Sequence, residues 1–243
     1  MIKQTKQFIG FSTGCLYRSN LPMSKVAELY YANGANAIEL GFKTPADFFK
    51  LKLTDKLIKA VKKFSYISIH APWKEVRYDQ GQETKKIVKK LKEACAKLPI
   101  KGIVLHPGAI DDFTLLNKSK LPFLLENMDG RKRAGTHPED FKELGKKCNF
   151  NFVLDLQHAY EHDPSMKLAK DFVKIMGSRL QHLHVSGNSE TEIHVPTFCA
   201  QNQKAIVKAL KLKLPGVKIL EGILLEDIEN SIKKELDFVA KFK

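Results

Sequence analysis

The sequence is poor in cysteine, and its cysteines form no recognisable pair. Four cysteines occur among 243 residues, widely and irregularly spaced at Cys15, Cys95, Cys148 and Cys199. Because no CxxC pair is present, the chain offers neither a disulfide framework nor a zinc ribbon. Sparse cysteines of this kind are typical of a reducing compartment, so we expect a cytoplasmic protein.

Long apolar runs are also absent from the sequence. The N-terminal segment MIKQTKQFIGFSTG has no extended apolar stretch after its lysines, so we expect no signal peptide. No segment approaches the roughly 20 consecutive apolar residues that a membrane span requires. We therefore expect no membrane partner.

Negative charge is scarce relative to positive charge. The chain carries 41 Lys and Arg against 27 Asp and Glu, a formal net charge of +14. A basic surface attracts polyanions such as nucleic acid or phosphorylated substrates. Much of the excess, however, is lysine in helix-like segments such as residues 85–92, which is typical of solvated helix faces. Both interpretations of the charge remain open at this point.

No linker or low-complexity tract interrupts the chain, so we expect one domain over residues 1–243. Short apolar runs predict strands over 8–12, 36–41, 65–70, 101–106, 121–126, 150–155, 180–185 and 217–221. Helical patterns lie between them, over 22–34, 54–63, 83–97, 137–147, 164–177, 200–211 and 225–241. The stretch 107–120 is too short for more than one or two helical turns.

This alternation predicts parallel strands joined by right-handed crossovers. Eight such units in a chain of this length fit a closed (β/α)8 TIM barrel. An open doubly wound sheet is the alternative. The first predicted strand is followed by STGCLY, which lacks the GxGxxG spacing of a dinucleotide site, so the barrel is favoured.

Side chains that can bind metals stand at or near the ends of six predicted strands. They are His70, His106, Glu126, Asp155 with His158 three residues later, His184 and Glu221. In an α/β barrel these strand ends line the catalytic mouth. Carboxylates and imidazoles crowded there would repel one another and lose solvation, and cations relieve both costs. The mixed ligand types suit zinc, manganese or iron.

A second cluster follows His184. Glu192 and His194 are two residues apart and face the same way if the segment is extended, so with His158 they could form another site. His182 shares a strand face with His184 and lies deeper, where it could act as a supporting partner of the ligands.

In this order the motifs resemble the endonuclease IV group of the xylose isomerase-like barrel superfamily. The matching segments are IHAPW, LHPG, LEN, LDLQH, LHVS, EIH and ILEG. The family pattern implies three metals, the first bound by His70, His106 and Glu126, the second by Glu126, Asp155, His184 and Glu221, and the third by His158, Glu192 and His194. Because Glu-x-His replaces the family's Asp-x-His, the third site is expected to be shifted, weaker or empty. We therefore expect two or three zinc ions, with manganese or iron as alternatives.

The resemblance implies hydrolysis of a phosphoester at abasic sites in DNA. Glu126 would bridge two ions, and Glu221 would orient or activate the attacking water. Trp73 is the candidate for stacking on a base or sugar, and Lys43 for a backbone contact. Arg131 and Arg133 could contact phosphate, although a solvated loop is the favoured explanation for them. The chain is shorter than typical members, and the long DNA-kinking loops of the family have no evident counterpart.

The segments LENMDGRKRAGTHPEDF, DLQHAYEHDPSM and HVPTF carry a competing resemblance, to barrels described as sugar-phosphate isomerase or epimerase-like. Such enzymes share only Glu126, Asp155, His184 and Glu221, which hold one divalent metal. Glu126 and Glu221 would then be the acid-base pair for a small phosphorylated sugar. A multi-iron oxygenase is a third possibility. The additional histidines favour a site with several metals.

Overall fold

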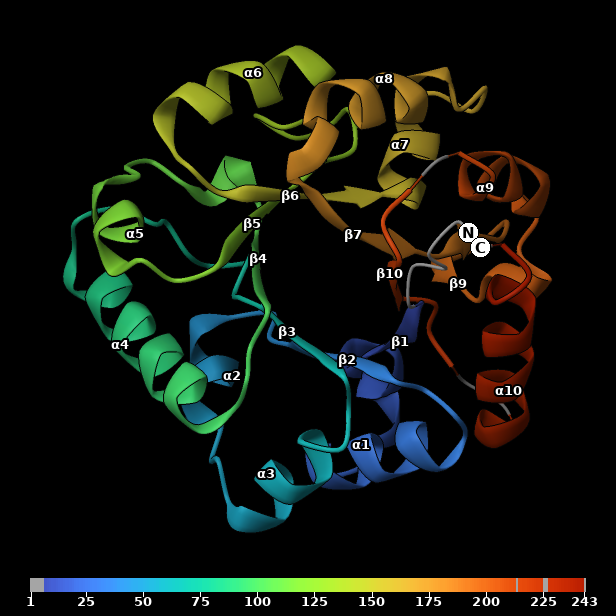
Figure 1. The fold of residues 1–243 in the computed structure, drawn as a ribbon, viewed down its shortest axis with the longest axis horizontal. Helices are drawn as coiled ribbons and strands as arrows, with labels where there is room; N and C mark the ends of the chain where they lie inside the picture. Colours follow the sequence, from blue (N-terminus) through green and yellow to red (C-terminus); the bar gives the residue numbers. More distant parts are fainter. Residues whose placement is uncertain (1–6, 213, 225–226, 243) are drawn as a thin grey trace, which may run out of the picture.

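Eight parallel strands close into a barrel ringed by helices in the computed structural model (Figure 1). The structure describes residues 7–212, 214–224 and 227–242. The strands follow one another around the barrel in the order β1-β10-β7-β6-β5-β4-β3-β2, and β1 pairs in parallel with both β2 and β10. This closure confirms the predicted (β/α)8 barrel and excludes the open sheet.

Every predicted barrel strand is present and lies within its predicted segment. The barrel strands are β1 (Phe8–Ser12), β2 (Ala37–Gly41), β3 (Tyr66–His70), β4 (Gly102–Leu105), β5 (Phe123–Glu126), β6 (Asn151–Asp155), β7 (Leu180–Val185) and β10 (Val217–Leu220). Apolar residues that point outward from these strands form the main core with the helices, among them Phe11, Ile69 and Leu125.

The predicted helices are also present. They are α1 (Met23–Ala32), α3 (Asp55–Val61), α4 (Gln82–Lys97), α6 (Pro138–Lys147), α8 (Lys167–Met176), α9 (Gln203–Leu210) and α10 (Ile228–Val239). The last helix was expected from residue 225, but 225–226 lie outside the described residues. The stretch 107–120 holds the 3-10 turn η2 (Pro107–Ala109) and the short α5 (Thr114–Ser119), as its length predicts.

Several short elements were not predicted. They are the 3-10 helices η1 (Thr13–Ser19), η3 (Gly177–Arg179) and η4 (Thr197–Cys199), the helices α2 (Pro45–Lys50) and α7 (Leu156–His162), and the hairpin strands β8 (Gly187–Asn188) and β9 (Ile193–Val195). Three of these elements follow barrel strands directly, because η1 begins after β1, α7 after β6 and β8 soon after β7. These elements therefore form part of the wall of the mouth, where the sequence pattern predicted neither helix nor strand.

The inside of the barrel changes from apolar to polar along its axis. Near the N-terminal ends of the strands, Phe8 packs with Tyr66 and Val217. In the middle, Val104, Leu124 and Val153 form a separate apolar cluster. Toward the C-terminal ends the interior side chains become carboxylates and imidazoles. The parallel register sets Asp155 beside His184, so their side chains share this face.

Helix α4 shows how the charge excess is distributed. Ile87, Leu91 and Ala94 are buried at helical spacing against the barrel. The exposed side carries Lys85, Lys86, Lys89 and Lys92. This part of the positive charge therefore lies on a solvated helix face, which is one of the two interpretations of the charge given above. Among the described residues, no helix combines the length and apolar character that a membrane crossing requires.

Candidate metal centre

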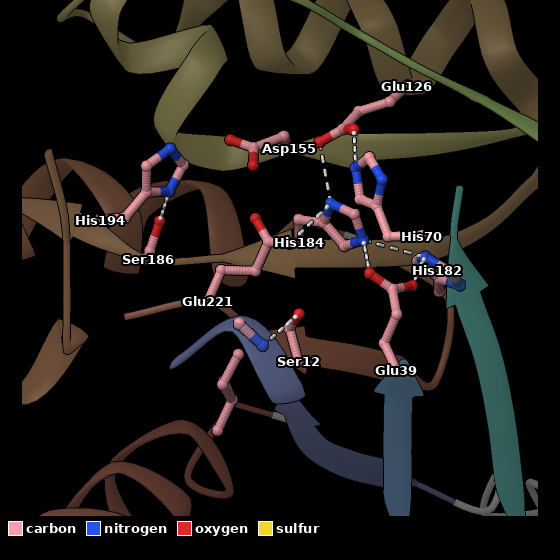
Figure 2. A network of polar contacts seen from close by, with 12 residues as sticks. Ser12, Glu39, His70, Glu126, Asp155, His182, His184, Ser186, His194 and Glu221 are labelled. Atoms are coloured by element: carbon pink, nitrogen blue, oxygen red, sulfur yellow. Dashed lines mark hydrogen bonds and ion pairs between the residues drawn. The ribbon is translucent and has the colours of Figure 1, made fainter. Parts of the chain in front are cut away.

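Four side chains from four neighbouring strand ends converge in the mouth of the barrel (Figure 2). Glu126 and Asp155 end β5 and β6, His184 lies near the end of β7, and Glu221 follows β10 directly. One potential ligand atom from each of the four lies within 4.8 Å of all the others. Glu126, Asp155 and His184 are almost completely buried, and Glu221 is partly exposed toward the cavity.

The two oxygens of Glu126 face different imidazoles. Oε1 is 2.8 Å from His184 Nδ1. Oε2 is 3.2 Å from His70 Nε2 and 3.2 Å from His106 Nε2. The Nδ1 of His70 is 3.0 Å from the Ala71 carbonyl and can donate a hydrogen bond to it. The lone pair on Nε2 is then available to a metal ion. Glu126 is therefore arranged as a carboxylate that can bridge two cations.

Asp155 provides the clearest sign that a cation belongs here. Its Oδ1 accepts a hydrogen bond from the backbone N–H of His158 at 2.6 Å and so begins helix α7. Its Oδ2 is buried and has no hydrogen-bond partner within the part of the chain that the structure describes. A buried carboxylate oxygen without a partner is costly, and a bound cation would satisfy it. The residues present therefore fit a divalent metal.

The surroundings of Glu126 and Glu221 shift their pKa values in opposite directions. Burial raises the pKa of Glu126, but the imidazoles of His184, His106 and His70 outweigh it and hold the pKa well below its usual range. Burial, together with the charges of Glu126 and Asp155, raises the pKa of Glu221 well above its usual range, although His184 opposes the shift. The surroundings thus favour the anion at Glu126 and the protonated form at Glu221 when no cation is bound.

The third predicted group is only partly assembled. The rings of His158 and His194 lie 5.8 Å apart, centroid to centroid. The Glu192 carboxylate instead pairs with Arg18 at 3.2 Å, and both side chains are 41% exposed. The expected alternation is broken because His194 has a φ of 63°, in the left-handed region. His194 Nδ1 contacts Ser186 Oγ at 2.9 Å, while Glu192 lies at the rim.

A close backbone contact holds the segment that carries His194 against the end of β10. The Ile223 N–H donates to the His194 carbonyl at 2.7 Å. A Cβ atom at Gly222 would lie 2.4 Å from the backbone nitrogen of Pro196. Glycine at this position therefore lets Glu221 and His194 line the same cavity.

Sequence reasoning missed one residue of the centre, Glu39. It lies in the middle of β2, is completely buried, and accepts a hydrogen bond from Ser68 Oγ at 2.8 Å. Its Oε1 is 3.2 Å from His184 Nε2. Burial raises its pKa, but the imidazoles of His184 and His182 outweigh it and lower the pKa to about 2. A lone acid within the apolar run AIELG was the available signal. His182 lies beside Glu39, deeper than His184, as expected for a supporting residue.

A cavity of about 940 Å³ opens above the metal-binding residues. The predicted substrate-binding residues Lys43, Trp73, Arg131 and Arg133 all line it. Trp73 is half-buried and packs against two candidate ligands, with ring centroids 4.7 Å from His70 and 5.7 Å from His106. It thus stands directly over the predicted reaction site.

The basic side chains at the rim of the cavity differ in whether they form ion pairs. Arg131 is paired with Asp129 at 2.7 Å and with Glu161 at 2.5 Å. The side chains of Lys43 and Arg133 are exposed and have no ion pair with any of the described residues. These two positive charges remain available to an anionic ligand.

Comparison with known families identifies the scaffold. The xylose isomerase-like TIM barrel model matches residues 27–242. The chain belongs to this family. No curated protein matches it.

The solved structures that share this fold include an endonuclease and proteins described as sugar epimerases or epimerase-like. Endonuclease IV from Thermus thermophilus is 18% identical, with a TM-score of 0.70 over 97% of this chain and 99% of that one. A D-tagatose 3-epimerase-like protein is 20% identical, with a TM-score of 0.68 over 97% and 98%. D-allulose 3-epimerase from Methylomonas sp. is 13% identical, with a TM-score of 0.68 over the whole of both chains. At these identities the likeness establishes the shared fold, and the activity must be argued from the site.

Proposed function

We propose that this protein is a metal-dependent phosphoester hydrolase that uses two divalent ions. The observation that carries the proposal is the position of Glu126, whose Oε1 faces His184 while its Oε2 faces His70 and His106. One ion would take His70, His106 and Glu126. The other would take Glu126, Asp155, His184 and Glu221. Mixed nitrogen and oxygen ligands favour zinc, with manganese or iron as alternatives.

When bound, such a pair of ions supplies a hydroxide near neutral pH and stabilises the charge on the attacking and leaving oxygens. Glu221 is the residue we assign to the attacking water. It is the member of the inner group that is partly exposed to the cavity. Once deprotonated, its carboxylate could orient the attacking water and accept its proton.

We propose two ions rather than three. His158 donates from Nδ1 to the Asn127 carbonyl at 2.9 Å, so its Nε2 is free, and His194 lies beside it. The carboxylate that would complete a third ligand set, Glu192, is engaged by Arg18. The free Nε2 of His158 can then accept a hydrogen bond from a substrate hydroxyl.

Glu192→Gln tests this assignment. We expect the variant to keep the zinc content of the natural protein, because the carboxylate lies at the rim and binds Arg18. Inductively coupled plasma mass spectrometry of protein purified without added metal measures the content. A loss of one zinc equivalent per chain would show that Glu192 is a ligand and would support a centre of three ions.

The pH dependence of metal binding is a further expectation. Although burial lowers the pKa of His184, the charges of Glu221, Glu126 and Glu39 raise it, and burial raises that of Glu221. Protons held on these groups in the metal-free protein must leave before an ion binds. Because both pKa values are raised, the apparent zinc affinity should still be rising with pH above about 6.5, the ordinary pKa of an imidazole. Calorimetry in buffers of different ionisation enthalpy should detect the released protons, and a pH-independent affinity would contradict the assignment.

An abasic site in DNA is the substrate that we propose for this centre. Three features support it: the order of the metal ligands, the unpaired cations Lys43 and Arg133 at the rim, and Trp73 above the metals. A repair nuclease must hold the damaged nucleotide out of the stack and present its phosphate to the metals. The cavity of about 940 Å³ has room for an extruded nucleotide.

A duplex with a single abasic site tests the substrate directly. We expect metal-dependent incision at roughly physiological salt, and a clear loss of incision in Trp73→Ala. Metal-stripped protein and an undamaged duplex serve as controls. Binding without incision in the presence of zinc, manganese or cobalt would contradict the proposal and leave the basic rim as a solvated surface.

A second candidate function is isomerisation or epimerisation of a phosphorylated sugar at a single metal. The observation that favours it is that Glu126, Asp155, His184 and Glu221 form a complete ligand group by themselves. Glu126 and Glu221 would then transfer a proton on either side of the substrate, and Lys43 or Arg133 would bind its phosphate. This chemistry has no need of His70 and His106, which distinguishes the two candidates.

A further inference from the structure

An acidic side chain lies inside the barrel one layer below the metal-binding residues. Glu39 on β2 points into the interior beside His184 and His182 (Figure 2) and is completely buried. A buried carboxylate surrounded by apolar side chains would be strongly unfavourable. Here the groups facing it are the Ser68 hydroxyl and two imidazoles, so its retention within an apolar strand points to a role in the centre above it.

The two nitrogens of His184 face different partners. Nδ1 points up toward Glu126 at 2.8 Å and Glu221 at 3.5 Å, which is the side where an ion would bind. Nε2 points down toward Glu39 Oε1 at 3.2 Å. If Nδ1 offers its lone pair to a metal, the ring proton must be on Nε2, which has two groups that can accept it nearby, Glu39 Oε1 at 3.2 Å and His182 Nε2 at 3.3 Å.

The residues around Glu39 are consistent with this proton arrangement. Ser68 donates its hydroxyl proton to Glu39 Oε2 at 2.8 Å. Tyr66 OH lies 2.8 Å from His182 Nδ1. His182 Nε2 lies 3.3 Å from His184 Nε2 and 3.7 Å from the Glu39 oxygen that Ser68 binds. The Ser68 hydroxyl and two imidazoles thus face one buried carboxylate.

We propose that Glu39 is a positioning residue that fixes the tautomer and orientation of the metal ligand His184. This role rests on the proposed function in one respect, namely that an ion binds at His184 Nδ1. A carboxylate that accepts the second N–H of a ligating histidine raises the basicity of the ligand and holds its ring in place. Ser68, His182 and Tyr66 in turn hold Glu39.

A cation held by Glu39, His182 and His184 is the competing explanation, because their ligand atoms also lie within 4.8 Å of one another and Glu39 Oε1 has no hydrogen-bond partner among the described residues. The positioning role is favoured on two grounds. Ser68 already donates to the other oxygen of Glu39, and a tetrahedral zinc site would need a fourth ligand. The experiment below separates the two explanations.

Zinc affinity of Glu39→Gln and Glu39→Ala, measured by competition with a chromophoric chelator, tests the proposal. Because loss of such a supporting partner costs about 10- to 100-fold in metal affinity, we expect Glu39→Ala to lose affinity in that range and Glu39→Gln to lose less. Glutamine retains an oxygen that accepts the His184 proton. The matched control is Glu235→Gln, which alters another buried carboxylate that binds the backbone N–H groups of Thr197 and Phe198 instead. It should bind zinc with unchanged affinity.

Imidazole ¹⁵N chemical shifts of the zinc-loaded proteins provide a readout that general loss of stability would not produce. The natural protein should show His184 bound through Nδ1 and protonated at Nε2, and Glu39→Ala should show this state weakened or mixed. Equal affinities and shifts in all variants would overturn the role of Glu39. Loss of a whole zinc equivalent in Glu39→Gln would establish the buried cation site instead. Failure of the natural protein to bind zinc would overturn the metal centre itself.

Discussion

Glu126→Gln should reduce phosphoester hydrolysis by on the order of 10³-fold, since two-metal charge stabilisation amounts to several kcal/mol. The variant should also lose zinc from both positions, because Glu126 faces His70 and His106 through one oxygen and His184 through the other. Replacing one oxygen by an amide removes a ligand and leaves a donor facing imidazoles. Activity assays and metal analysis on the same preparation measure both effects.

The fold is the control for this prediction. Glu126 ends β5 in a barrel held mainly by the apolar cluster outside the strands, so circular dichroism of the variant should remain that of the natural protein. Glu192→Gln provides a matched carboxylate-to-amide change at the rim. Unchanged zinc stoichiometry in a folded Glu126→Gln protein would contradict the bridging assignment.

The double variant His70→Ala and His106→Ala separates the two candidate functions. A two-ion hydrolase should lose one zinc equivalent and on the order of 10²-fold or more in activity, because the first ion would retain Glu126 alone. A one-metal isomerase should keep its metal in the group Glu126, Asp155, His184 and Glu221. Its turnover should then fall only slightly.

Metal content and turnover should be followed together in this variant. Trp73 packs on both imidazoles, so a Trp73→Ala protein shows how far lost packing alone changes the metal content. Near-natural hydrolysis by the double variant would refute the two-ion mechanism. Retention of sugar epimerisation with one bound metal would establish the second candidate function.

The barrel could be predicted from the sequence because its signals are local and repeated. Each strand is a short apolar run, and each long helix is an amphipathic segment such as α4, with Ile87 and Leu91 on the buried face. The meeting of His70, Glu126 and Asp155 in the mouth could also be predicted, because each ends a strand and the C-terminal strand ends of such a barrel line its mouth. Whether they bind metal stays a prediction.

The remainder of the site depends on contacts that no local pattern encodes. The placement of Glu192 follows from Arg18, which is far from it in the sequence, and from the left-handed backbone of His194. Helix α7 was missed because it begins directly at Asp155, with a metal-ligand candidate as its N-cap instead of a turn. The contact between Glu39 and His184 could not be predicted because it depends on closure of the barrel, which brings β2 opposite His184.

Anomalous diffraction at the zinc absorption edge, on crystals of zinc-loaded protein, tests the central claim most directly. The account predicts two peaks about 3.5–4 Å apart that share the Glu126 carboxylate, the spacing of two-metal hydrolytic sites. One peak should lie among His70, His106 and Glu126, and the other beside His184 Nδ1. A single peak among Glu126, Asp155, His184 and Glu221, with His70 and His106 free of metal, would contradict it.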